Sequence, residues 1–273
     1  MVDPRDDTEL HEVVNDAAAI LNAVTQQFLD GRGAPSAVQK KGNDFATEVD
    51  LAIEREVVES LQKATGIGVH GEEFGGADLH GSQVWVLDPI DGTFNYAAGT
   101  PMAAILLGLV RDGQPVAGLT WLPFTDERYV GIVGAGLWRN GSRQPVLEQT
   151  DLADAIVGVG TFNVDSRGAV PGRYRLAVIE QLSRRCSRMR MHGATGVDLA
   201  YAAGGILGGA ISFSGHPWDH AAGVALVRAA GGEVSNLTGG AWTVDSRSLV
   251  VGSPGVHEAL IDVVRAAGDV EDY

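Results

Sequence analysis

Residues 85–95 read Trp-Val-Leu-Asp-Pro-Ile-Asp-Gly-Thr-Phe-Asn, and this stretch decides both the fold and the position of its chemistry. The short apolar, β-rich run 84–87 predicts a strand that delivers Asp88 at its end. Pro89 then fixes the backbone and withholds a donor, so Asp91 follows across a sharp turn. Both carboxylates can therefore converge on one point.

The backbone of the same stretch offers further binding groups. The carbonyl of Ile90 lies between the two carboxylates and is free to act as a hard oxygen ligand. Gly92 has no side chain, so a ligand can approach closely, and its N–H and that of Thr93 can donate to phosphate oxygens where a short helix begins. Taken alone, an Asp-Gly step is more often only a turn, so the interpretation depends on the motifs elsewhere in the chain.

Other acidic residues occur where the chain can return to this point. Glu72 and Glu73 precede the strand, and one carboxylate can swing back beside Asp88, although a lone Glu-Glu pair is usually a solvated loop. Asp219 opens a helix in Pro-Trp-Asp-His-Ala-Ala-Gly, residues 217–223. It fits a helix N-cap, and its remaining lone pairs can also reach a metal.

The segment 40–50 carries three more charged residues of interest. Asp50 fits the N-cap of a helix, whereas Lys40 and Asp44 can be ordinary loop charges. His216 and His220 flank the second acidic motif, where packing or a place at the substrate rim is favoured over metal ligation. The tryptophans Trp85 and Trp218 are expected in the core.

Hydrophobic periodicity predicts the elements that carry these motifs. Helices are expected over 8–29, 50–64, 173–184, 197–203, 220–230 and 256–267, and strands over 84–87, 102–110, 116–122, 128–133, 155–159, 188–191, 210–213 and 248–251. The strands up to 133 are joined by tight turns and predict an antiparallel sheet, while 31–42 is expected to be an exposed, mobile loop. Later strands alternate with helices. The prediction is helix–sheet–helix layering in two halves, 1–145 and 146–273.

Composition limits the classes of function. The 20 basic and 35 acidic residues give 20 − 35 = −15, with a pI near 4.7, which excludes nucleic acid and anionic membrane as partners. Bound cations would let such a chain accept an anionic substrate. The single cysteine excludes an intramolecular disulfide, and no apolar run suits a membrane helix. The acidic N-terminus does not resemble a signal peptide, so the cytoplasm is expected.

Together these motifs resemble the inositol monophosphatase family. The matching segments are Gly-Glu-Glu at 71–73, Asp-Pro-Ile-Asp-Gly-Thr at 88–93, Trp-Asp-x-Ala-Ala-Gly from 218, and Lys-x-x-x-Asp-Phe-x-Thr-x-Val-Asp at 40–50, in the family's order. The stretch 223–232 and the C-terminal 271–273 are especially similar to mycobacterial and other actinobacterial members. The resemblance implies a layered αβαβα sandwich of the α/β or α+β class, as in fructose-1,6-bisphosphatase, and a homodimer.

The resemblance also implies a metal site. Glu72, Asp88 and the Ile90 carbonyl would hold one Mg²⁺, and Asp88, Asp91 and Asp219 a second. Glu73 would lie in the outer shell, with Lys40 and Asp44 near a weaker third ion. An all-oxygen set of this kind suits Mg²⁺ or Mn²⁺ rather than Zn²⁺.

By the same resemblance the chain hydrolyses a small phosphate monoester, with inositol 1-phosphate as the first choice. Asp50, Thr93 and Glu72 would form the catalytic set, with Thr93 bonded to Asp50 to position the attacking water. The residues expected around the substrate are Asp91, Gly92, Thr93, Gly193, Ala194, Thr195, Ser212 and Asp219. In-line attack of water on the phosphate needs charge neutralisation and positioning rather than a covalent intermediate. Lithium sensitivity is a family expectation.

The sequence departs from the family pattern on the alcohol side of the substrate. Ser212 stands seven positions before Asp219, where members that act on inositol phosphates commonly have an acid, and 193–195 read Gly-Ala-Thr instead of Gly-Thr-Ala. Histidinol phosphate, fructose 1,6-bisphosphate and a 3′-phosphoadenosine nucleotide therefore stay open as substrates. A non-catalytic metal- or phosphate-binding module and a structural Ca²⁺-binding domain are the alternatives from other classes.

Overall fold

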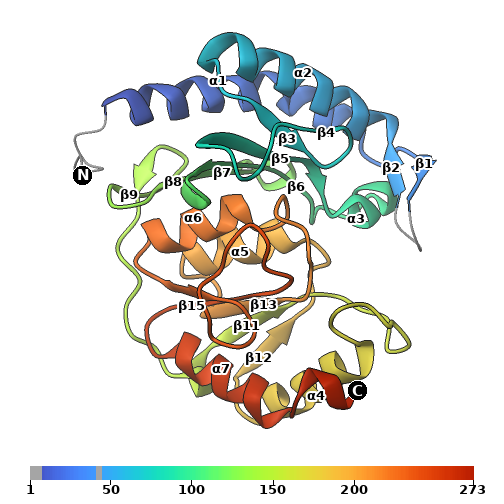
Figure 1. Ribbon diagram of the computed structural model, residues 1–273, viewed down its shortest axis with the longest axis vertical. Helices are drawn as coiled ribbons and strands as arrows, with labels where there is room; N and C mark the ends of the chain where they lie inside the picture. The colour runs from blue at the N-terminus through green and yellow to red at the C-terminus, as the bar shows by residue number, and fades with distance from the viewer. Residues whose placement is uncertain (1–7, 41–44) are drawn as a thin grey trace.

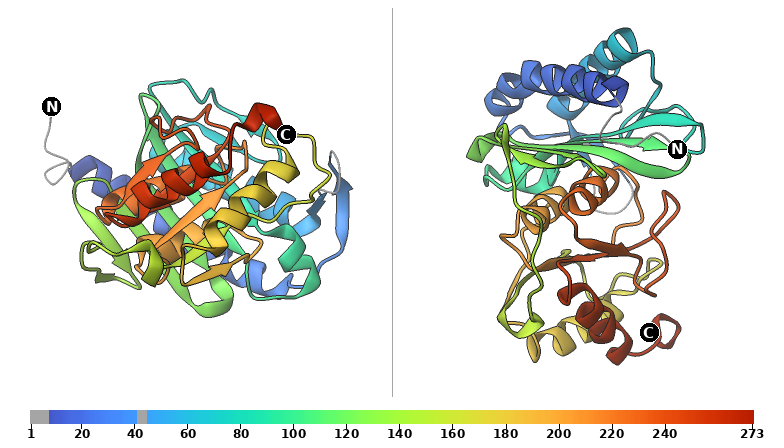
Figure 2. Two further views of the ribbon diagram at one scale, coloured as in Figure 1. Left: turned by 90° about the horizontal axis from the view of Figure 1, so that it is seen from below. Right: turned by 90° about the vertical axis from the view of Figure 1, so that its left-hand side faces the viewer.

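Helices and sheets alternate in five layers along the long axis of the molecule (Figure 1). The structure is a computed structural model, and it describes residues 8–40 and 45–273. Helices α1 (Thr8–Asp30) and α2 (Glu48–Thr65) form one outer layer, and α4 (Gly172–Ser183) and α7 (Val256–Ala266) form the other. Two sheets lie inside them, with α5 (Thr195–Ala203) and α6 (Ala221–Ala229) between the sheets. The predicted αβαβα layering is confirmed, and Figure 2 shows the same layers from the side.

The first sheet has the strand order β10-β9-β8-β7-β6-β5-β3-β4. Its strands are β3 (Val69–Gly71), β4 (Gly75–Gly76), β5 (Gln83–Asp91), β6 (Ala104–Arg111), β7 (Gln114–Leu122), β8 (Glu127–Ile132), β9 (Gly136–Arg139) and β10 (Ser142–Arg143). Strands β5 to β8 are antiparallel as predicted, and β9 and β10, which were not predicted, continue the antiparallel pairing. Strand β3 runs parallel to β5, with Val69 opposite Trp85. This parallel pairing brings the residues that follow β3 to the carboxyl-terminal half of β5.

The second sheet has the order β12-β11-β13-β15-β14. Its strands are β11 (Ile156–Val159), β12 (Arg188–Arg190), β13 (Gly209–Ser212), β14 (Glu233–Ser235) and β15 (Leu249–Gly252). Strand β11 is parallel to β12 and β13, whereas β15 is antiparallel to β13 and β14. Because β13 is central, the residues after it are held over the middle layer of helices.

The outer helices are amphipathic, and the middle helices are buried on all sides. Helix α1 buries Leu10, Val14, Ala17, Leu21, Val24 and Phe28, which is the helical period expected for a one-sided stripe. Every residue of α6 from Ala221 to Val227 is buried. The sheet admits this helix closely because a Cβ at Gly118 would lie 2.1 Å from the carbonyl oxygen of Ala222. The small side chain of glycine is therefore required there.

Helix α2 begins with a capping box, which corrects one prediction. The N-cap is Thr47, whose side chain accepts from the N–H of Asp50, while Asp50 bonds back to the Thr47 backbone. Asp50 is therefore the third residue of the helix and not its N-cap. The helix ends at Gly66 in the left-handed conformation, with φ of 68°.

The prediction of a loop over 31–42 is wrong in part. Strand β1 (Ser36–Gln39) pairs antiparallel with β2 (Phe45–Thr47). Every residue of β1 is exposed, so the segment shows no apolar alternation that would reveal a strand. Asp44 lies outside the described residues. No helix in the described part of the chain is both long and apolar enough to cross a membrane.

Candidate active site

A cavity of about 850 Å³ opens between the first sheet, the middle helices and the loop after β13. Acidic side chains line one end of it, namely Glu72, Asp88, Asp91 and Asp219. The same cavity is also lined by 92–95, 193–195 and 212–216 and by Arg175 and Arg247. The structure therefore brings all of the predicted metal and substrate residues to one cavity.

Asp88 is the most deeply placed acid of this acidic end. It lies within β5, is 2% exposed, and its Oδ1 has no hydrogen-bond partner among the residues that the structure describes. Burial raises the pKa of Asp88 well above its usual value, and the nearby charges of Glu72, Asp91 and Asp219 raise it further. An orphan carboxylate oxygen among other acids is an arrangement that a cation would stabilise.

Asp91 is held in place by the start of α5. Its Oδ1 accepts from the N–H of Thr195 at 3.0 Å, and its Oδ2 accepts from the N–H of Gly196 at 2.6 Å. Burial, followed by the charge of Asp219, raises the pKa of Asp91 despite these two bonds. The sharp turn predicted before Asp91 is instead an irregularity in the pairing of β5 with β6 between Asp88 and Asp91, so the strand continues through Pro89.

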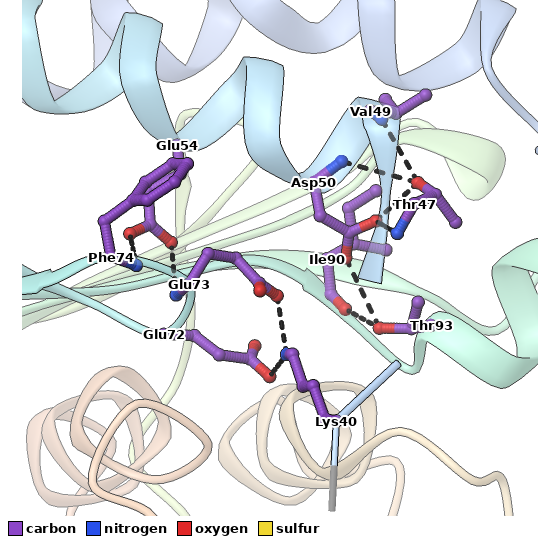
Figure 3. Close-up of polar contacts among 10 residues, drawn as sticks. All are labelled: Lys40, Thr47, Val49, Asp50, Glu54, Glu72, Glu73, Phe74, Ile90 and Thr93. Carbon is purple, nitrogen blue, oxygen red and sulfur yellow. Dashed lines mark hydrogen bonds and ion pairs between the residues drawn. The ribbon is translucent and has the colours of Figure 1, made fainter. Parts of the chain in front are cut away.

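Lys40 directly follows strand β1, and its side chain reaches Glu72 and Glu73 at the acidic end (Figure 3). Its Nζ lies 2.6 Å from Oε1 of Glu72 and 2.6 Å from Oε1 of Glu73. Burial alone would lower the pKa of Lys40, but the charges and hydrogen bonds of the two glutamates outweigh it and raise that pKa. Burial raises the pKa of Glu72 to about 7, against the opposing effect of Lys40. The ammonium group thus holds part of the acidic end in this structure.

Glu54 supports the turn that carries Glu72 and Glu73, and this role was not predicted from the sequence. Its carboxylate accepts from the backbone N–H groups of Glu73 and Phe74, each at 2.9 Å (Figure 3). The side chain is fully buried, and burial raises its pKa. The sequence signal was a glutamate next to Ile53, at the apolar face of the predicted helix. An acid is rarely buried without a partner, so this position indicated a buried carboxylate with hydrogen-bond donors around it.

Thr93 and Asp50 form the pair that the resemblance implies. The hydroxyl of Thr93 donates toward Oδ1 of Asp50 at 3.4 Å and toward the carbonyl of Ile90 at 3.0 Å (Figure 3). Asp50 also accepts from the N–H of Thr47 at 2.8 Å. Burial raises the pKa of Asp50 to about 6. Thr93 opens the short helix α3 (Thr93–Ala98), and Gly92 precedes it with φ of 83°, which favours glycine.

Ser212 ends β13 and is bound to a buried histidine. Its Oγ lies 2.9 Å from Nε2 of His220 and accepts from the N–H of Ser214 at 3.3 Å. Burial lowers the pKa of His220 to about 3, so the imidazole is neutral at pH 7. Within the described chain the other ring nitrogen, Nδ1, has no partner. His220 therefore orients Ser212 rather than entering the cavity, which agrees with the predicted packing role.

One further prediction for this side of the cavity is wrong, and another is confirmed only in part. Helix α6 begins at Ala221 with His220 as its N-cap, so Asp219 is not the cap and lies one residue too early. Trp218 packs against the core, but it is only half-buried and also lines the cavity, stacked on His216 with ring centroids 4.6 Å apart. Trp85, in contrast, is fully buried in the core as expected.

The segment 193–195 is fixed from two directions. The amide of Asn95 donates to the carbonyl of His192 at 2.7 Å and to that of Met102 at 2.8 Å. His192 in turn lies 2.6 Å from buried Asp198. These contacts place Gly193, with φ of 79°, directly over Asn95. The roles of Asn95, His192 and Asp198 were not predicted from the sequence.

The acidic end fits a hard metal cation by its chemistry. The donors are carboxylate and carbonyl oxygens, and Asp88 has an unpaired buried oxygen. Within 8–40 and 45–273, however, no three Asp, Glu, His or Cys side chains are arranged to hold an ion as they stand. Lys40 contributes to this arrangement, because its ammonium occupies an oxygen of Glu72 that a metal would need. Each oxygen of Asp91 accepts one N–H and keeps a lone pair for a metal.

Comparison with known proteins identifies the chain. A sequence model described as the inositol monophosphatase family matches residues 6–269. The chain belongs to this family. Among curated members it is 65% identical over 268 residues to inositol-1-monophosphatase ImpA of Mycolicibacterium smegmatis, covering 98% of this chain and 97% of that protein. It is 63% identical to the probable inositol 1-monophosphatase ImpA of Mycobacterium tuberculosis, covering 98% and 99%.

Solved structures of the family agree with the fold. The IMPase of Thermotoga maritima superposes with a TM-score of 0.84 at 27% identity, covering 95% of this chain and 98% of that one. Inositol monophosphatase from Anabaena superposes with a TM-score of 0.80 at 26% identity, covering 94% and 96%. Membership of the family makes the chain a phosphatase, and the predicted class of enzyme is confirmed.

Proposed function

We propose that the protein hydrolyses inositol 1-phosphate to inositol and phosphate with the help of Mg²⁺. The observation that carries the proposal is the meeting, in one cavity, of four acids with Thr93, whose hydroxyl donates toward the buried Asp50 behind it. The names of the mycobacterial relatives at 63% and 65% identity support the choice of substrate.

The acidic end would hold two or three ions. Glu72, Asp88 and the carbonyl of Ile90 would bind one, and Asp88, Asp91 and Asp219 a second. When bound, Mg²⁺ or Mn²⁺ lowers the pKa of water and stabilises the developing charge on the leaving oxygen. For Glu72 to serve as a ligand, its contact with Lys40 must lengthen, because the ammonium occupies Oε1 in this structure. Lys40 then remains beside Glu73.

Thr93 and Asp50 would orient the attacking water. The Thr93 hydroxyl donates toward Asp50, so its lone pairs can accept a proton from the water. The pKa of Asp50, raised to about 6, leaves this carboxylate ionised at neutral pH yet basic enough to draw the hydroxyl proton. Glu72, with a pKa of about 7, borders the same point and completes the catalytic set.

The remaining groups would position the substrate. The N–H groups of Gly92 and Thr93 open helix α3 and suit phosphate oxygens. Asp91, Asp219, Ser212 and the segment Gly193–Ala194–Thr195 would face the alcohol half. The Ser212 hydroxyl, held by His220, offers a weaker and uncharged contact where the family pattern for inositol phosphates commonly has an acid. Other small esters are therefore retained as alternative substrates.

The proposal includes cytoplasmic residence, a homodimer, lithium sensitivity and two folding halves divided near residue 145. The acidic net charge of −15 supports a small-molecule substrate rather than nucleic acid or a membrane surface. Each of these finer statements rests on the family resemblance and on composition.

Phosphate release from a panel of monoesters tests the proposal. The purified protein is assayed with inositol 1-phosphate, histidinol phosphate, fructose 1,6-bisphosphate and a 3′-phosphoadenosine nucleotide, each with Mg²⁺ and with EDTA. We expect Mg²⁺-dependent release that is fastest from inositol 1-phosphate. Faster release from another ester would keep the mechanism and change the substrate. Metal binding without release from any ester would favour the non-catalytic module instead.

A further inference from the structure

Asp198 is a buried carboxylate in the wall of the cavity that the proposed mechanism does not use. It lies in the first turn of α5, is 4% exposed, and lines the cavity. Its Oδ1 lies 2.6 Å from Nδ1 of His192. Among residues 8–40 and 45–273 its other oxygen, Oδ2, makes no hydrogen bond, yet it is not sealed from solvent as the unpaired oxygen of Asp88 is. Half of this carboxylate is therefore available to a ligand.

Two elements that border the cavity place Asp198 there. Ala194 and Thr195 line the cavity, and Asp198 follows them at the spacings that share one face of a helix. On its other side lies β11, where a Cβ at Gly158 would come within 2.7 Å of Oδ1 of Asp198. Strand β11 runs on into Gly160, which also lines the cavity. Asp198 thus lies near the carboxyl end of a parallel strand, where sheets of this kind bind ligands.

His192 fixes the orientation of this carboxylate. Its side chain is only 16% exposed, and its ring packs edge-on against Tyr201 with ring centroids 6.0 Å apart. Its backbone carbonyl accepts from the amide of Asn95, so the residue is held at both ends. Burial raises the pKa of Asp198, and the hydrogen bond and charge of His192 oppose that increase. A carboxylate held in this way has little freedom left to lose when a ligand binds.

A free carboxylate oxygen in a cavity wall suits a neutral hydrogen-bond donor. An ionised carboxylate only accepts hydrogen bonds, and each hydroxyl of a polyol can donate one. A second phosphate or carboxylate would be repelled at this point. Ser212 occupies the position where the family pattern for inositol phosphates commonly has an acid that contacts ring hydroxyls. Asp198 offers an acid for the same purpose from a different element of the fold.

We propose that Asp198 accepts a hydrogen bond from a hydroxyl of the alcohol half of the ester, with His192 as its positioning residue. The proposal rests on the phosphatase function above and deepens it, because such a contact selects esters of polyols. The phosphate lies among the acids and the N–H groups that open α3, and the hydroxyl lies at Asp198. His192 acts only through Asp198.

The test compares two cyclic esters that differ in their hydroxyl groups. Phosphate release from inositol 1-phosphate and from cyclohexyl phosphate is measured in Mg²⁺ for the wild type and for Asp198→Asn, which keeps the shape of the side chain and removes its charge. We expect kcat/KM for inositol 1-phosphate to fall by at least about 10-fold, mainly through KM, because a hydrogen bond to a charged group is lost. Cyclohexyl phosphate should change by less than about 2-fold.

Two substitutions of His192 test the positioning role. Glutamine keeps a donor for Asp198, so His192→Gln should stay within about 2-fold of the wild type on both esters. Phenylalanine keeps a ring without a donor, so His192→Phe should raise KM for inositol 1-phosphate by about 3- to 10-fold with kcat unchanged. Asp112→Asn is the matched control, since it removes the same charge from an exposed turn and should leave both esters unchanged.

The outcomes separate a substrate contact from a structural role. Equal losses on both esters in a folded Asp198→Asn protein, or no loss on either, would overturn the contact and leave the phosphatase function intact. A larger loss on histidinol phosphate, whose alcohol carries an ammonium group, would also overturn the hydroxyl contact and assign Asp198 to a cation. If Asp198→Asn does not fold, the His192 variants decide, since equal KM values for inositol 1-phosphate in His192→Gln and His192→Phe would reject the proposal.

Failure of the phosphatase function is recognised separately, because the wild type would then release phosphate from no ester. Titration calorimetry in Mg²⁺ takes the place of kinetics for any ester that is not hydrolysed. Weaker binding of inositol 1-phosphate to Asp198→Asn than to Asp112→Asn, with equal binding of cyclohexyl phosphate, would support the contact. Equal binding of inositol 1-phosphate to the two variants would reject it.

Discussion

Two parts of the cavity wall are built in different ways. The acidic end takes Asp88 and Asp91 from one strand and Glu72 from the turn after the neighbouring parallel strand. The two arginines of the wall are Arg175 from α4 and Arg247 from the connection between β14 and β15, segments far apart in the chain. Backbone N–H groups hold Asp91, and Lys40 holds Glu72. Of the two arginines, only Arg175 makes a hydrogen bond within the described chain, to the carbonyl of Val170.

The two parts therefore differ in what limits them, which is charge repulsion among the buried acids and solvent exposure among the arginines. The acids are buried together, so their charges repel and the site depends on cations. The arginines are partly solvated, so leaving them without an acidic partner in the described part of the chain costs less than crowding the buried acids together. We therefore expect substitutions at the acidic end to alter catalysis and stability strongly. Substitutions at Ser212 and at the arginines should alter mainly substrate preference.

The largest effect is expected at Thr93. Thr93→Val removes the hydroxyl that links the water to Asp50 and should reduce kcat by about 100-fold or more, the usual contribution of a positioned proton acceptor. Thr93→Ser keeps the hydroxyl and should stay within about 10-fold of the wild type. Steady-state assays of inositol 1-phosphate hydrolysis measure both. Equal activity of the Val and Ser variants would remove Thr93 from the mechanism.

The next effect is on stability without metal. Burial raises the pKa of Asp88, so the folded protein binds this proton more tightly than the unfolded chain does. Folding is therefore most favoured at low pH and loses that advantage as pH rises from about 4 through the raised pKa. In EDTA, the free energy of unfolding of Asp88→Asn, relative to that of the wild type, should increase by about 1–3 kcal/mol when the pH is raised from 5 to 8. Urea unfolding at both pH values measures the gain.

Asp112→Asn is the control for that comparison. Asp112 is exposed in a turn with φ of 48°, a conformation that asparagine also adopts readily. Its stability relative to the wild type should not change with pH. A gain at Asp88 that is independent of pH would show that the carboxylate is not held under repulsion.

Lys40 is expected to compete with the metal. In Lys40→Met, Glu72 is released, so the apparent affinity for Mg²⁺ should rise by roughly 5- to 10-fold, while the metal-free protein becomes less stable because its acids lose their cation. Thermal melting at increasing Mg²⁺ concentrations measures both quantities. The exposed Lys63 of α2, changed to Met, should alter neither. Weaker Mg²⁺ binding in Lys40→Met would instead make Lys40 an aid to the ion.

The smallest effect is expected at Ser212. Ser212→Ala removes one neutral hydroxyl that is already bound to His220, so KM for inositol 1-phosphate should rise by only about 2- to 5-fold with kcat unchanged. The same kinetic assay resolves the two constants. A fall in kcat of more than 10-fold would place Ser212 among the catalytic groups.

The convergence of Asp88 and Asp91 could be predicted from the sequence because it is local, whereas Glu72 and Asp219 were assigned to the same site by the family resemblance. Asp88 and Asp91 lie three residues apart, and strand and helix periods show where each motif falls. The layering also follows from alternating helices and strands. The short strands β1 and β4 were missed because exposed or glycine-only segments carry no apolar pattern.

Long-range contacts were not predictable in this way. Asp219 fits an N-cap by its position, yet α6 begins two residues later, and capping depends on backbone angles that composition does not specify. Trp218 has the size of a core residue but stacks on His216 at the cavity. The aromatic ring of Phe213 under Arg175 lies 38 residues away in the sequence, and the N–H groups that Glu54 accepts lie 19 and 20 residues away, so only the folded chain brings them together.

The most direct test of the account is phosphate release from inositol 1-phosphate by Asp91→Asn in saturating Mg²⁺, with Asp112→Asn beside it. Asp91 touches both proposed ion and substrate, and asparagine keeps its shape while removing its charge. The account predicts that Asp91→Asn melts as a folded protein and loses at least about 100-fold in kcat, while Asp112→Asn keeps full activity. A folded Asp91→Asn protein with activity near that of the wild type would contradict the metal-assisted site at the acidic end.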